Sequence, residues 1–139
     1  MEEKIEIDYK DKYIRLVAEF DNYKKRTIKE NNTMLKNANE KLVVDLLPII
    51  DDLERSLDYI NDESTKSGIE MVLNKFKTLL KGYNVNKIPT IGNEFNSDLH
   101  ESISVVESDK KTDEIIDEVL SGYIMNDKVI RYSKVVISK

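Results

Sequence analysis

The sequence predicts an α+β fold in which a long N-terminal helix and a second, shorter helix precede a small C-terminal β-rich domain. In three stretches between Tyr9 and Tyr83, apolar residues recur every three or four positions, which is the spacing of amphipathic helices. The chain has only 4 Gly and 2 Pro among 139 residues, so few positions interrupt a helix. Beyond Asn84 the apolar spacing changes to every second residue, as in strands. The expected parts are a long dimerising helix (1–60), a short bundle helix (61–84) and a β-domain (85–139).

The first part of the long helix is expected to pair with another helix. Its apolar stripe advances by 4, 3, 4 and 3 residues through Tyr9, Tyr13, Leu16, Phe20 and Tyr23. This is the a/d spacing of a two-stranded coiled coil. The stripe then falls on polar residues, although no Gly or Pro ends the helix there. A short, tyrosine-rich and partly polar seam is expected to melt before the rest of the molecule.

Three consecutive cations, Lys24, Lys25 and Arg26, stand where this apolar stripe lapses. Consecutive residues are about 100° apart around a helix, so at least one of the three faces away from any partner helix. A solvated helix face explains most runs of this kind. Their coincidence with the lapse of the stripe also fits a surface that binds a protein partner.

The second part of the long helix has a different apolar spacing. Its stripe advances by 3, 4, 4, 3, 4, 4 and 3 residues through Leu35, Ala38, Leu42, Leu46, Ile49, Leu53, Leu57 and Ile60. This 11-residue period favours nearly straight packing, and Pro48 is expected to kink the helix. A helix that ends near residue 60 is on the order of 85 Å long at 1.5 Å per residue. A compact monomer of this size cannot contain such a helix, so we expect self-association.

The second helix is expected to follow a turn at residues 61–64, with Ser64 or Thr65 as its N-cap. Gly82 is expected to end it in the left-handed conformation. Its apolar face contains Ile69, Val72, Leu73, Phe76, Leu79, Leu80 and Tyr83. Two such helices from each of two chains predict a dimeric four-helix bundle.

The β-domain is predicted from short apolar runs that lie between turn residues. The runs are 85–88, 103–106, 115–123 and 129–137. Asn126 and Asp127, between the last two runs, are typical of a hairpin turn. Residues 112–120 are the least regular part and also fit a helical turn.

Composition and motifs argue against catalysis. The chain has no Cys, and its single His, His100, has Ser and Asp neighbours only within one short segment. A catalytic triad requires groups that converge in space, so His100 is expected to cap or pack at the edge of the β-domain. No phosphate-binding GxxxxGK[ST] or GxGxxG segment occurs. We therefore expect a protein that is not an enzyme and that uses no cofactor or metal.

Charge and hydropathy indicate the compartment and argue against nucleic-acid and membrane partners. The formal net charge of −5 and the pI of about 5.0 argue against a general nucleic-acid binder. The N-terminus is charged throughout, and no run approaches the roughly 20 apolar residues that span a bilayer. A soluble cytoplasmic protein with no membrane partner is expected, whether from a bacterium or, after processing, from an organelle.

Four segments resemble the GrpE family, the nucleotide exchange factors of DnaK-type chaperones. They are AEFDNYKKRT (18–27), LLPIIDDLERSL (46–57), GNEFNSDLHESISVVES (92–108) and GYIMNDKVIRYSKVVIS (122–138). The segments cover nearly the whole chain in the family's order. One departure is Asn96-Ser97, which stands where the family usually has Asp-Pro. Only 17 residues precede Ala18, so the paired stem is expected to be short.

The resemblance implies a parallel homodimer with a paired stem, a four-helix bundle and one β-domain per protomer. In this family the β-domain docks on the ATPase domain of the chaperone and holds its nucleotide cleft open, and the factor itself binds no nucleotide. The expected chaperone contacts are Lys24, Lys25, Arg26, Lys128, Arg131 and Ile137. The expected dimer and bundle core is Tyr13, Leu16, Phe20, Leu42, Leu46, Ile49, Leu53, Leu57, Val72 and Phe76.

Alternatives remain for single residues and for the whole chain. The three cations of the stem also fit a segment that only shapes the helix pair, and Arg131 also fits a solvated strand position. Phe95 is expected to be a buried anchor of the β-domain. The runner-up function is a coiled-coil adaptor dimer whose β-domain binds another protein. A nucleic-acid binder that uses the cation cluster is a third reading, which the net charge opposes.

Overall fold

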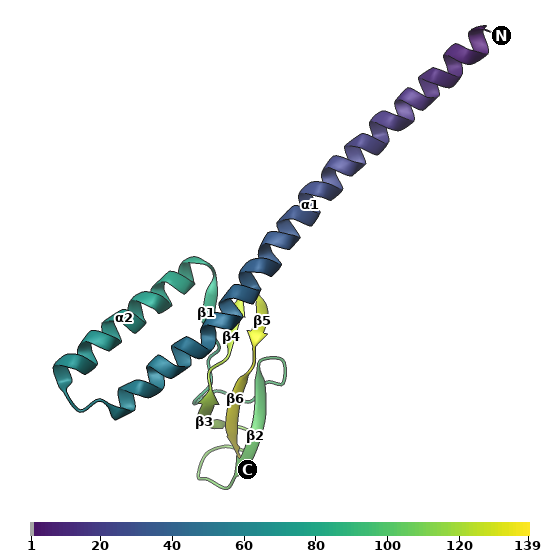
Figure 1. Ribbon diagram of the computed structural model, residues 1–139. Coiled ribbons are helices and arrows are strands. Elements are labelled where there is room, and N and C mark those ends of the chain that lie inside the picture. Colours follow the sequence, from purple (N-terminus) through teal and green to yellow (C-terminus); the bar gives the residue numbers. More distant parts are fainter. Residues whose placement is uncertain (1) are drawn as a thin grey trace. The chain divides into compact units, whose positions relative to one another are not determined.

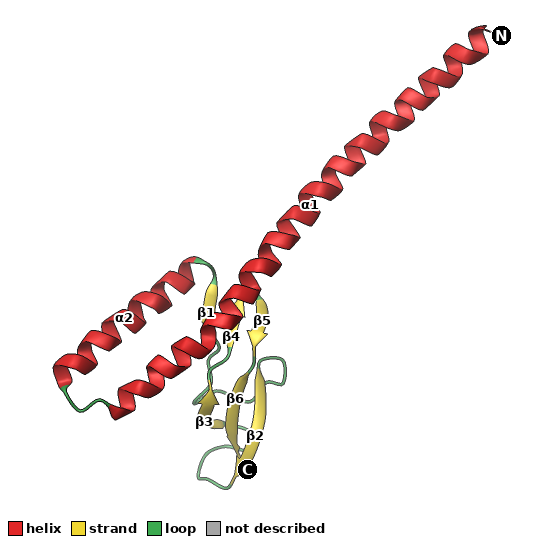
Figure 2. Ribbon diagram, in the orientation of Figure 1, coloured by secondary structure: helices red, strands yellow, loops and turns green. Residues whose placement is uncertain are grey.

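The computed structural model describes the backbone of residues 2–139 and the side chains of residues 8–139. Two helices come first, α1 (Glu2–Ser56) and α2 (Glu63–Gly82), with the 3₁₀ turn η1 (Leu57–Tyr59) between them (Figure 1). Within this range the strands are β1 (Val85–Lys87), β2 (His100–Val106), β3 (Ile115–Leu120), β4 (Tyr123–Met125), β5 (Lys128–Arg131) and β6 (Ser133–Ser138) (Figure 2). The predicted α+β class, with a long helix, a second helix and a small C-terminal β-domain, is confirmed.

The helix α1 is continuous over 55 residues and passes through Pro48. The chain divides into two compact units, of which the first ends at Lys41 and the second begins at Leu42. In the first unit all side chains from residue 8 to residue 39 are exposed except that of Thr27, which is half-buried. The expected end near residue 60 is a few residues too late, because α1 ends at Ser56 and η1 follows. No helix in the described part of the chain is long and apolar enough to cross a membrane.

The caps of α2 differ from those expected. The Asp62 carboxylate accepts a hydrogen bond of 3.1 Å from the Thr65 N–H, so Asp62 is the N-cap. The prediction of Ser64 or Thr65 is wrong because both residues lie inside the helix. At the other end Gly82 is the last helical residue, and Asn84 takes the left-handed conformation with φ of 59°. The prediction for Gly82 is wrong because asparagine also tolerates that conformation.

The strands form two three-stranded sheets with the orders β1-β4-β5 and β2-β6-β3. Neighbouring strands are antiparallel except β2 and β6, which are parallel. Residues 112–120 contain β3 and not a helix. The run 129–137, expected as one strand, is divided at Tyr132 between β5 of one sheet and β6 of the other. Apolar alternation continues across this break, so residue spacing does not reveal it.

The larger core of the second unit lies between α1, α2 and the sheet β1-β4-β5. Its buried residues are Val43, Leu47, Ile50, Leu73, Leu80, Val85, Tyr123 and Met125. Leu53, Leu57 and Phe76 lie partly buried against this cluster. A smaller cluster of Ile115, Val135 and Ile137, with Phe95 packed against it, forms the interior of the β2-β6-β3 sheet.

In the second unit α1 carries two apolar faces. Val43 and Ile50 are buried in the core, whereas Leu42 and Ile49, each one residue earlier, are 60% and 53% exposed. On α2, Val72 is 59% exposed. The stripe predicted from the sequence therefore includes a face that the rest of its own chain leaves open.

Candidate functional site

The β4–β5 hairpin ends in a two-residue turn, Asn126-Asp127, with φ of 49° and 64°. Two consecutive positive φ angles are those of a type I′ turn, whose twist matches that of antiparallel strands. Met125 and Lys128 form the pair that closes the turn, and Lys128 is exposed. The hairpin turn predicted at Asn126-Asp127 is confirmed. Residues 125–128 are called the hairpin tip below.

Hydrogen bonds attach the hairpin tip to the turn that follows α2. The Asn126 N–H donates to the Asn84 carbonyl at 3.2 Å, and the Asn84 side-chain amide donates to Asn126 Oδ1 at 3.3 Å. Asn84 also begins the connection to β1, which pairs with β4 along its whole length. The tip is therefore an ordered part of the second unit, and it presents a lysine side chain.

Arg131, at the other end of β5, is turned toward the helices. Its Nη1 and Nη2 lie 2.6 and 2.8 Å from the two carboxylate oxygens of Asp51 on α1. Its Nε and Nη2 also donate to the Ser121 carbonyl at 2.9 and 2.6 Å. The Arg131 side chain is 17% exposed. In this structure the Arg131 guanidinium is occupied within the chain, and its role as a partner contact stays a prediction.

Ile137 also lies inside the β-domain. Its side chain is 7% exposed and belongs to the cluster with Ile115 and Val135, against which Phe95 packs. In this structure Ile137 supports the sheet from within, and its role as an apolar partner contact stays a prediction. The expectation of Phe95 as a buried anchor agrees with its partly buried position in the same cluster.

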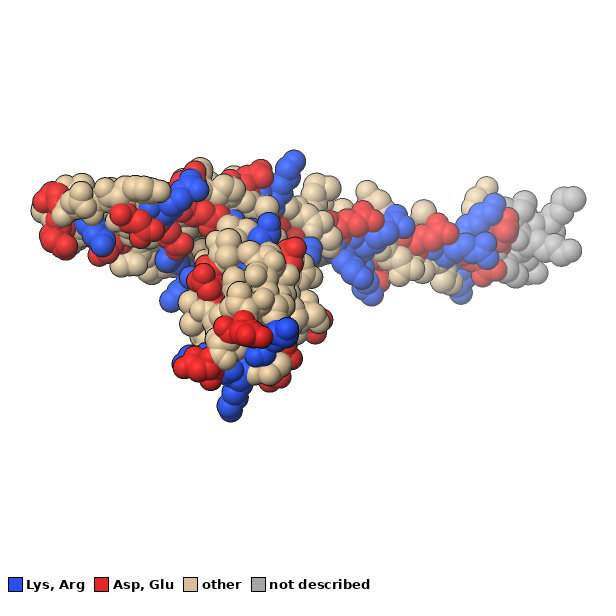
Figure 3. All heavy atoms as spheres, turned by 90° about the horizontal axis from the view of Figure 1, so that it is seen from below, with Lys and Arg blue, Asp and Glu red and all other residues tan. Residues whose placement is uncertain are grey.

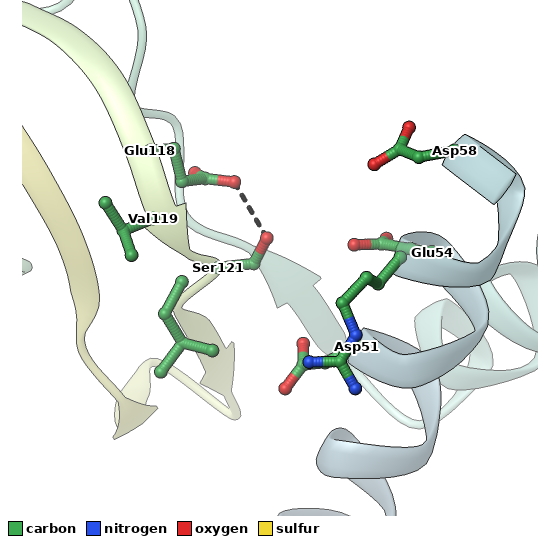
Figure 4. Close-up of a pocket in the computed structure, with 8 residues that line it drawn as sticks. Asp51, Glu54, Asp58, Glu118, Val119 and Ser121 are labelled. Carbon is green, nitrogen blue, oxygen red and sulfur yellow. Dashed lines mark hydrogen bonds between the residues drawn. The ribbon is translucent and has the colours of Figure 1, made fainter.

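A cavity of about 330 Å³ opens between the C-terminal part of α1 and β3 (Figure 4). Asp51, Glu54 and Asp58 come from the helical side, and Glu118 and Ser121 face them from the strand side. Sequence reasoning did not identify this acidic cavity, because its two walls lie about sixty residues apart along the chain.

Cations of the same chain neutralise the more enclosed carboxylates of this cavity. Besides the Arg131 pair, Glu54 Oε1 lies 2.7 Å from Lys77 Nζ on α2, and Glu118 Oε1 lies 3.0 Å from Lys87 Nζ on β1. Among the residues that the structure describes, no group of three or more His, Cys, Asp or Glu is placed to hold a metal ion. The carboxylates thus join α1, α2 and the β-domain to one another.

Hydrogen bonding overcomes burial at Glu118. Desolvation alone would raise the pKa of this carboxyl, but hydrogen bonds from Thr90 and Ser121 and the ammonium of Lys87 hold the pKa of Glu118 below its ordinary value. Glu118 is therefore ionised at neutral pH and serves as a shared acceptor for β1, β3 and the loops beside them.

Tyr123 lies buried next to the Arg131–Asp51 pair. Burial raises the pKa of Tyr123 to about 12, and the charges of Glu54 and Asp51 add to this effect. The Arg131 guanidinium carbon lies 5.4 Å from the centre of the Tyr123 ring. The Tyr123 hydroxyl has no hydrogen-bond partner among the described residues. The aromatic ring thus forms one wall of the site that holds Arg131.

The three cations of α1 are exposed and interact with side chains of their own helix. Lys24 Nζ lies 5.0 Å from the Phe20 ring centre, and Lys25 Nζ lies 3.1 Å from Asp21 Oδ2. Arg26 is 3.8 Å from Glu30 and its guanidinium carbon is 5.7 Å from the Tyr23 ring centre. Acidic and basic side chains alternate along this unit on the face that Figure 3 shows. These exposed pairs contribute little to stability, so the cations remain available to a partner.

The residues expected in a dimer core fall into two groups. Tyr13, Leu16, Phe20, Leu42, Ile49 and Val72 are exposed, whereas Leu46, Leu53, Leu57 and Phe76 are half-buried. Exposed apolar side chains at this density are typical of a surface that binds another protein.

His100 has a structural place at the start of β2, as expected. The Asn96 N–H donates to His100 Nδ1 at 3.0 Å, so Nε2 carries the proton and donates to the Pro89 carbonyl at 2.8 Å. The imidazole ring is 4% exposed and lies 6.0 Å from the Phe95 ring centre. Both ring nitrogens are engaged by the backbone, which leaves no lone pair to act as a base.

Comparison with known proteins gives a consistent result over the whole chain. The model of the family described as GrpE matches residues 1–139. Protein GrpE of Porphyromonas gingivalis is 42% identical over 135 residues, which are 93% of this chain and 70% of that protein. Protein GrpE of Bacteroides fragilis is 41% identical over 138 residues, 95% of this chain and 71% of that protein. Protein GrpE of Methanothermobacter thermautotrophicus is 41% identical over 126 residues, 90% of this chain and 71% of that protein.

Proposed function

The chain belongs to the GrpE family and is a non-enzymatic nucleotide exchange factor for DnaK, and from this we propose that its hairpin tip docks on the ATPase domain of DnaK. The observation that carries this proposal is the position of Lys128, the one expected β-domain contact whose side chain is exposed, since Arg131 and Ile137 are enclosed. Docking through this tip favours the open form of the nucleotide cleft.

The mechanism follows from the coupling of two binding equilibria. A factor that binds the open ATPase domain more tightly than the closed, ADP-bound domain must weaken ADP binding by the same ratio. Couplings of this kind are typically about 5- to 150-fold. No bond is made or broken in exchange, so the mechanism requires no catalytic side chain.

Two copies of this chain are proposed to form the working unit. The exposed apolar side chains of α1 and α2 in the second unit, such as Leu42, Ile49 and Val72, provide the faces of a four-helix bundle. The stripe of Tyr13, Leu16 and Phe20 provides a coiled-coil seam for the first unit. In this proposal residues 1–60 form the dimerising helix, 61–84 the short bundle helix and 85–139 the chaperone-binding β-domain.

The cations Lys24, Lys25 and Arg26 are proposed to form a second contact with DnaK. Their side chains are exposed, and their intrahelical partners are weak and replaceable. Contacts between exposed charges act mainly on the association rate and weaken as salt is added. If the association rate depends on salt and this dependence disappears when all three cations are replaced by glutamine, the contact is supported. If the replacement leaves the association rate unchanged, the segment only shapes the helix pair.

Release of a fluorescent ADP analogue from DnaK, followed by stopped flow, tests the proposed docking site. Wild-type protein is expected to accelerate release strongly, and Lys128→Ala is expected to reduce that acceleration by about tenfold, or about 1.4 kcal/mol. Lys134→Ala is the matched control, because Lys134 is also an exposed lysine on a strand but lies on β6. Equal effects of the two substitutions would contradict docking through the hairpin tip.

A further inference from the structure

We propose that Arg131 and Asp51 are positioning residues, whose ion pair fixes the orientation of the hairpin tip on α1 and thereby sets how well the protein distinguishes open from closed DnaK. The proposal rests on the proposed function, because it assumes that the hairpin tip docks on the ATPase domain. It assigns these two residues a role in exchange although both side chains are mostly enclosed within the chain.

The contacts of Arg131 leave its side chain almost no freedom. A guanidinium has five N–H groups, and four hydrogen bonds from Arg131 are made to Asp51 and the Ser121 carbonyl. Asp51 is on α1, and Ser121 lies between β3 and β4. One side chain of β5 thus binds both the long helix and the connection between the two sheets.

The Arg131–Asp51 pair fixes the orientation of β5 relative to α1, which the surrounding apolar core does not. The core between α1 and the β1-β4-β5 sheet consists of aliphatic and aromatic side chains such as Leu47, Ile50 and Met125, and apolar contact is non-directional. A two-point pair between a planar guanidinium and a carboxylate has a fixed geometry. Replacing a partly buried ion pair by apolar residues often costs no stability, so the role assigned to this pair is orientation.

The distance from the pair to the docking residue is short. Arg131 and Lys128 are the two ends of β5, three residues apart, which corresponds to about 10 Å along a strand. The hairpin tip therefore follows any rotation of β5 about the helix. The Glu54–Lys77 pair links the turn of α1 that contains Asp51 to α2, so this turn of the helix is held in place as well.

Loosening the contact between β5 and α1 is expected to change how well the protein distinguishes open from closed DnaK before it changes the fold. If β5 rotates freely, the hairpin tip follows the closed ATPase domain as easily as the open one, and binding energy no longer favours opening. The ratio of the dissociation constant for ADP-bound DnaK to that for nucleotide-free DnaK then falls. Partial unfolding, in contrast, weakens both affinities by one common factor and leaves the ratio unchanged.

The test measures this ratio for full-length protein and three variants, with circular dichroism as a check on folding. Asp51→Asn removes the charge of the pair, Asp51→Glu retains it, and Asp52→Asn removes the neighbouring exposed carboxylate, which pairs with Arg55 on its own helix. We expect Asp51→Asn to lower the ratio about tenfold, within the usual range of such couplings. Asp51→Glu and Asp52→Asn are expected to stay within about twofold of wild type.

Each outcome separates the inference from the proposed function. A ratio that is unchanged in Asp51→Asn, or two affinities that fall by the same factor, overturns the positioning role while exchange by the wild type still stands. A wild-type ratio of one, with no acceleration of ADP release, overturns the proposed docking and the positioning role together.

Discussion

Arg131 on β5 and Asp51 on α1 form a two-point ion pair, with N–O distances of 2.6 and 2.8 Å, although they lie 80 residues apart in sequence. Both residues belong to segments by which the sequence resembles the GrpE family, and only the structure brings them together. The pair thus holds a charged residue of the predicted binding segment against α1.

Loss of Asp51 is expected to destabilise the second unit. Asp51→Ala removes the carboxylate from the Arg131 side chain, which is only 17% exposed in the wild type, so we expect unfolding to require about 2 kcal/mol less free energy. Asp52→Ala removes the exposed partner of Arg55 and should cost less than about 0.5 kcal/mol. Chemical denaturation at one fixed protein concentration measures both. Equal losses of unfolding free energy in the two variants would show that the Arg131–Asp51 pair contributes no more to stability than an exposed ion pair.

Gly122 is expected to tolerate no side chain. A Cβ at this position would collide with the Ser133 backbone nitrogen and lie 2.7 Å from the Arg131 carbonyl, so Gly122→Ala should cost about 3 kcal/mol or more. Gly68, inside α2, has open space around it, and Gly68→Ala should stabilise the helix by about 0.5–1 kcal/mol. Thermal unfolding of both variants provides the comparison, and a Gly122→Ala protein as stable as wild type would contradict the close approach.

Alkaline pH is expected to destabilise the fold through Tyr123. Because the pKa of Tyr123 is raised to about 12, the unfolded chain loses this proton first, and stability falls as pH rises from about 10 to about 12. The difference of about two pKa values corresponds to about 2.7 kcal/mol. In Tyr123→Phe the alkaline loss should be smaller by that amount, whereas Tyr83→Phe, at an exposed position, should retain it. If the free energy of unfolding falls equally with rising pH in wild type and Tyr123→Phe, the effect is disproved.

The open face of α1 is expected to hold two chains together. Ile49→Asp places a charge on the proposed bundle face and should raise the dimer dissociation constant about 100-fold, or about 2.7 kcal/mol. Ile91→Asp is a suitable control, because Ile91 is 63% exposed but lies in a loop of the β-domain. Sedimentation equilibrium distinguishes the two. A monomeric wild type, or a dimer whose dissociation constant is unchanged by Ile49→Asp, would exclude this face as the interface.

Much of the fold could be predicted from the sequence because local spacing determines it. The two helices, the hairpin turn at Asn126-Asp127 and the change to strands after Asn84 all follow from patterns within a few residues. The N-cap at Asp62 was missed because several polar residues in one turn fit that position equally well. The break at Tyr132 was missed because the chain changes sheets without a change in its apolar alternation.

The candidate site was less predictable because it depends on which elements pack together. Alternation along the C-terminal segment gives two faces but does not say which is buried, so the burial of Ile137 could not be predicted from residue spacing. Likewise, Val43 and Leu42 are adjacent apolar residues, and spacing alone does not separate the face that packs on the same chain from the face left open. Lys128 was expected as a partner contact from the resemblance of residues 122–138 to the GrpE family, and the structure gives it an exposed position at the start of β5.

Photo-cross-linking from the hairpin tip tests the docking site most directly. The chain contains no Cys, so Lys128→Cys creates one attachment point for a benzophenone label, and Lys134→Cys creates a matched control on β6. With nucleotide-free DnaK at a saturating concentration, which offsets the affinity lost with the Lys128 ammonium, the label at position 128 should attach to the ATPase domain, and the yield should fall when ADP is added. Equal yields from both positions, or attachment of the position-128 label only outside the ATPase domain, would contradict the account.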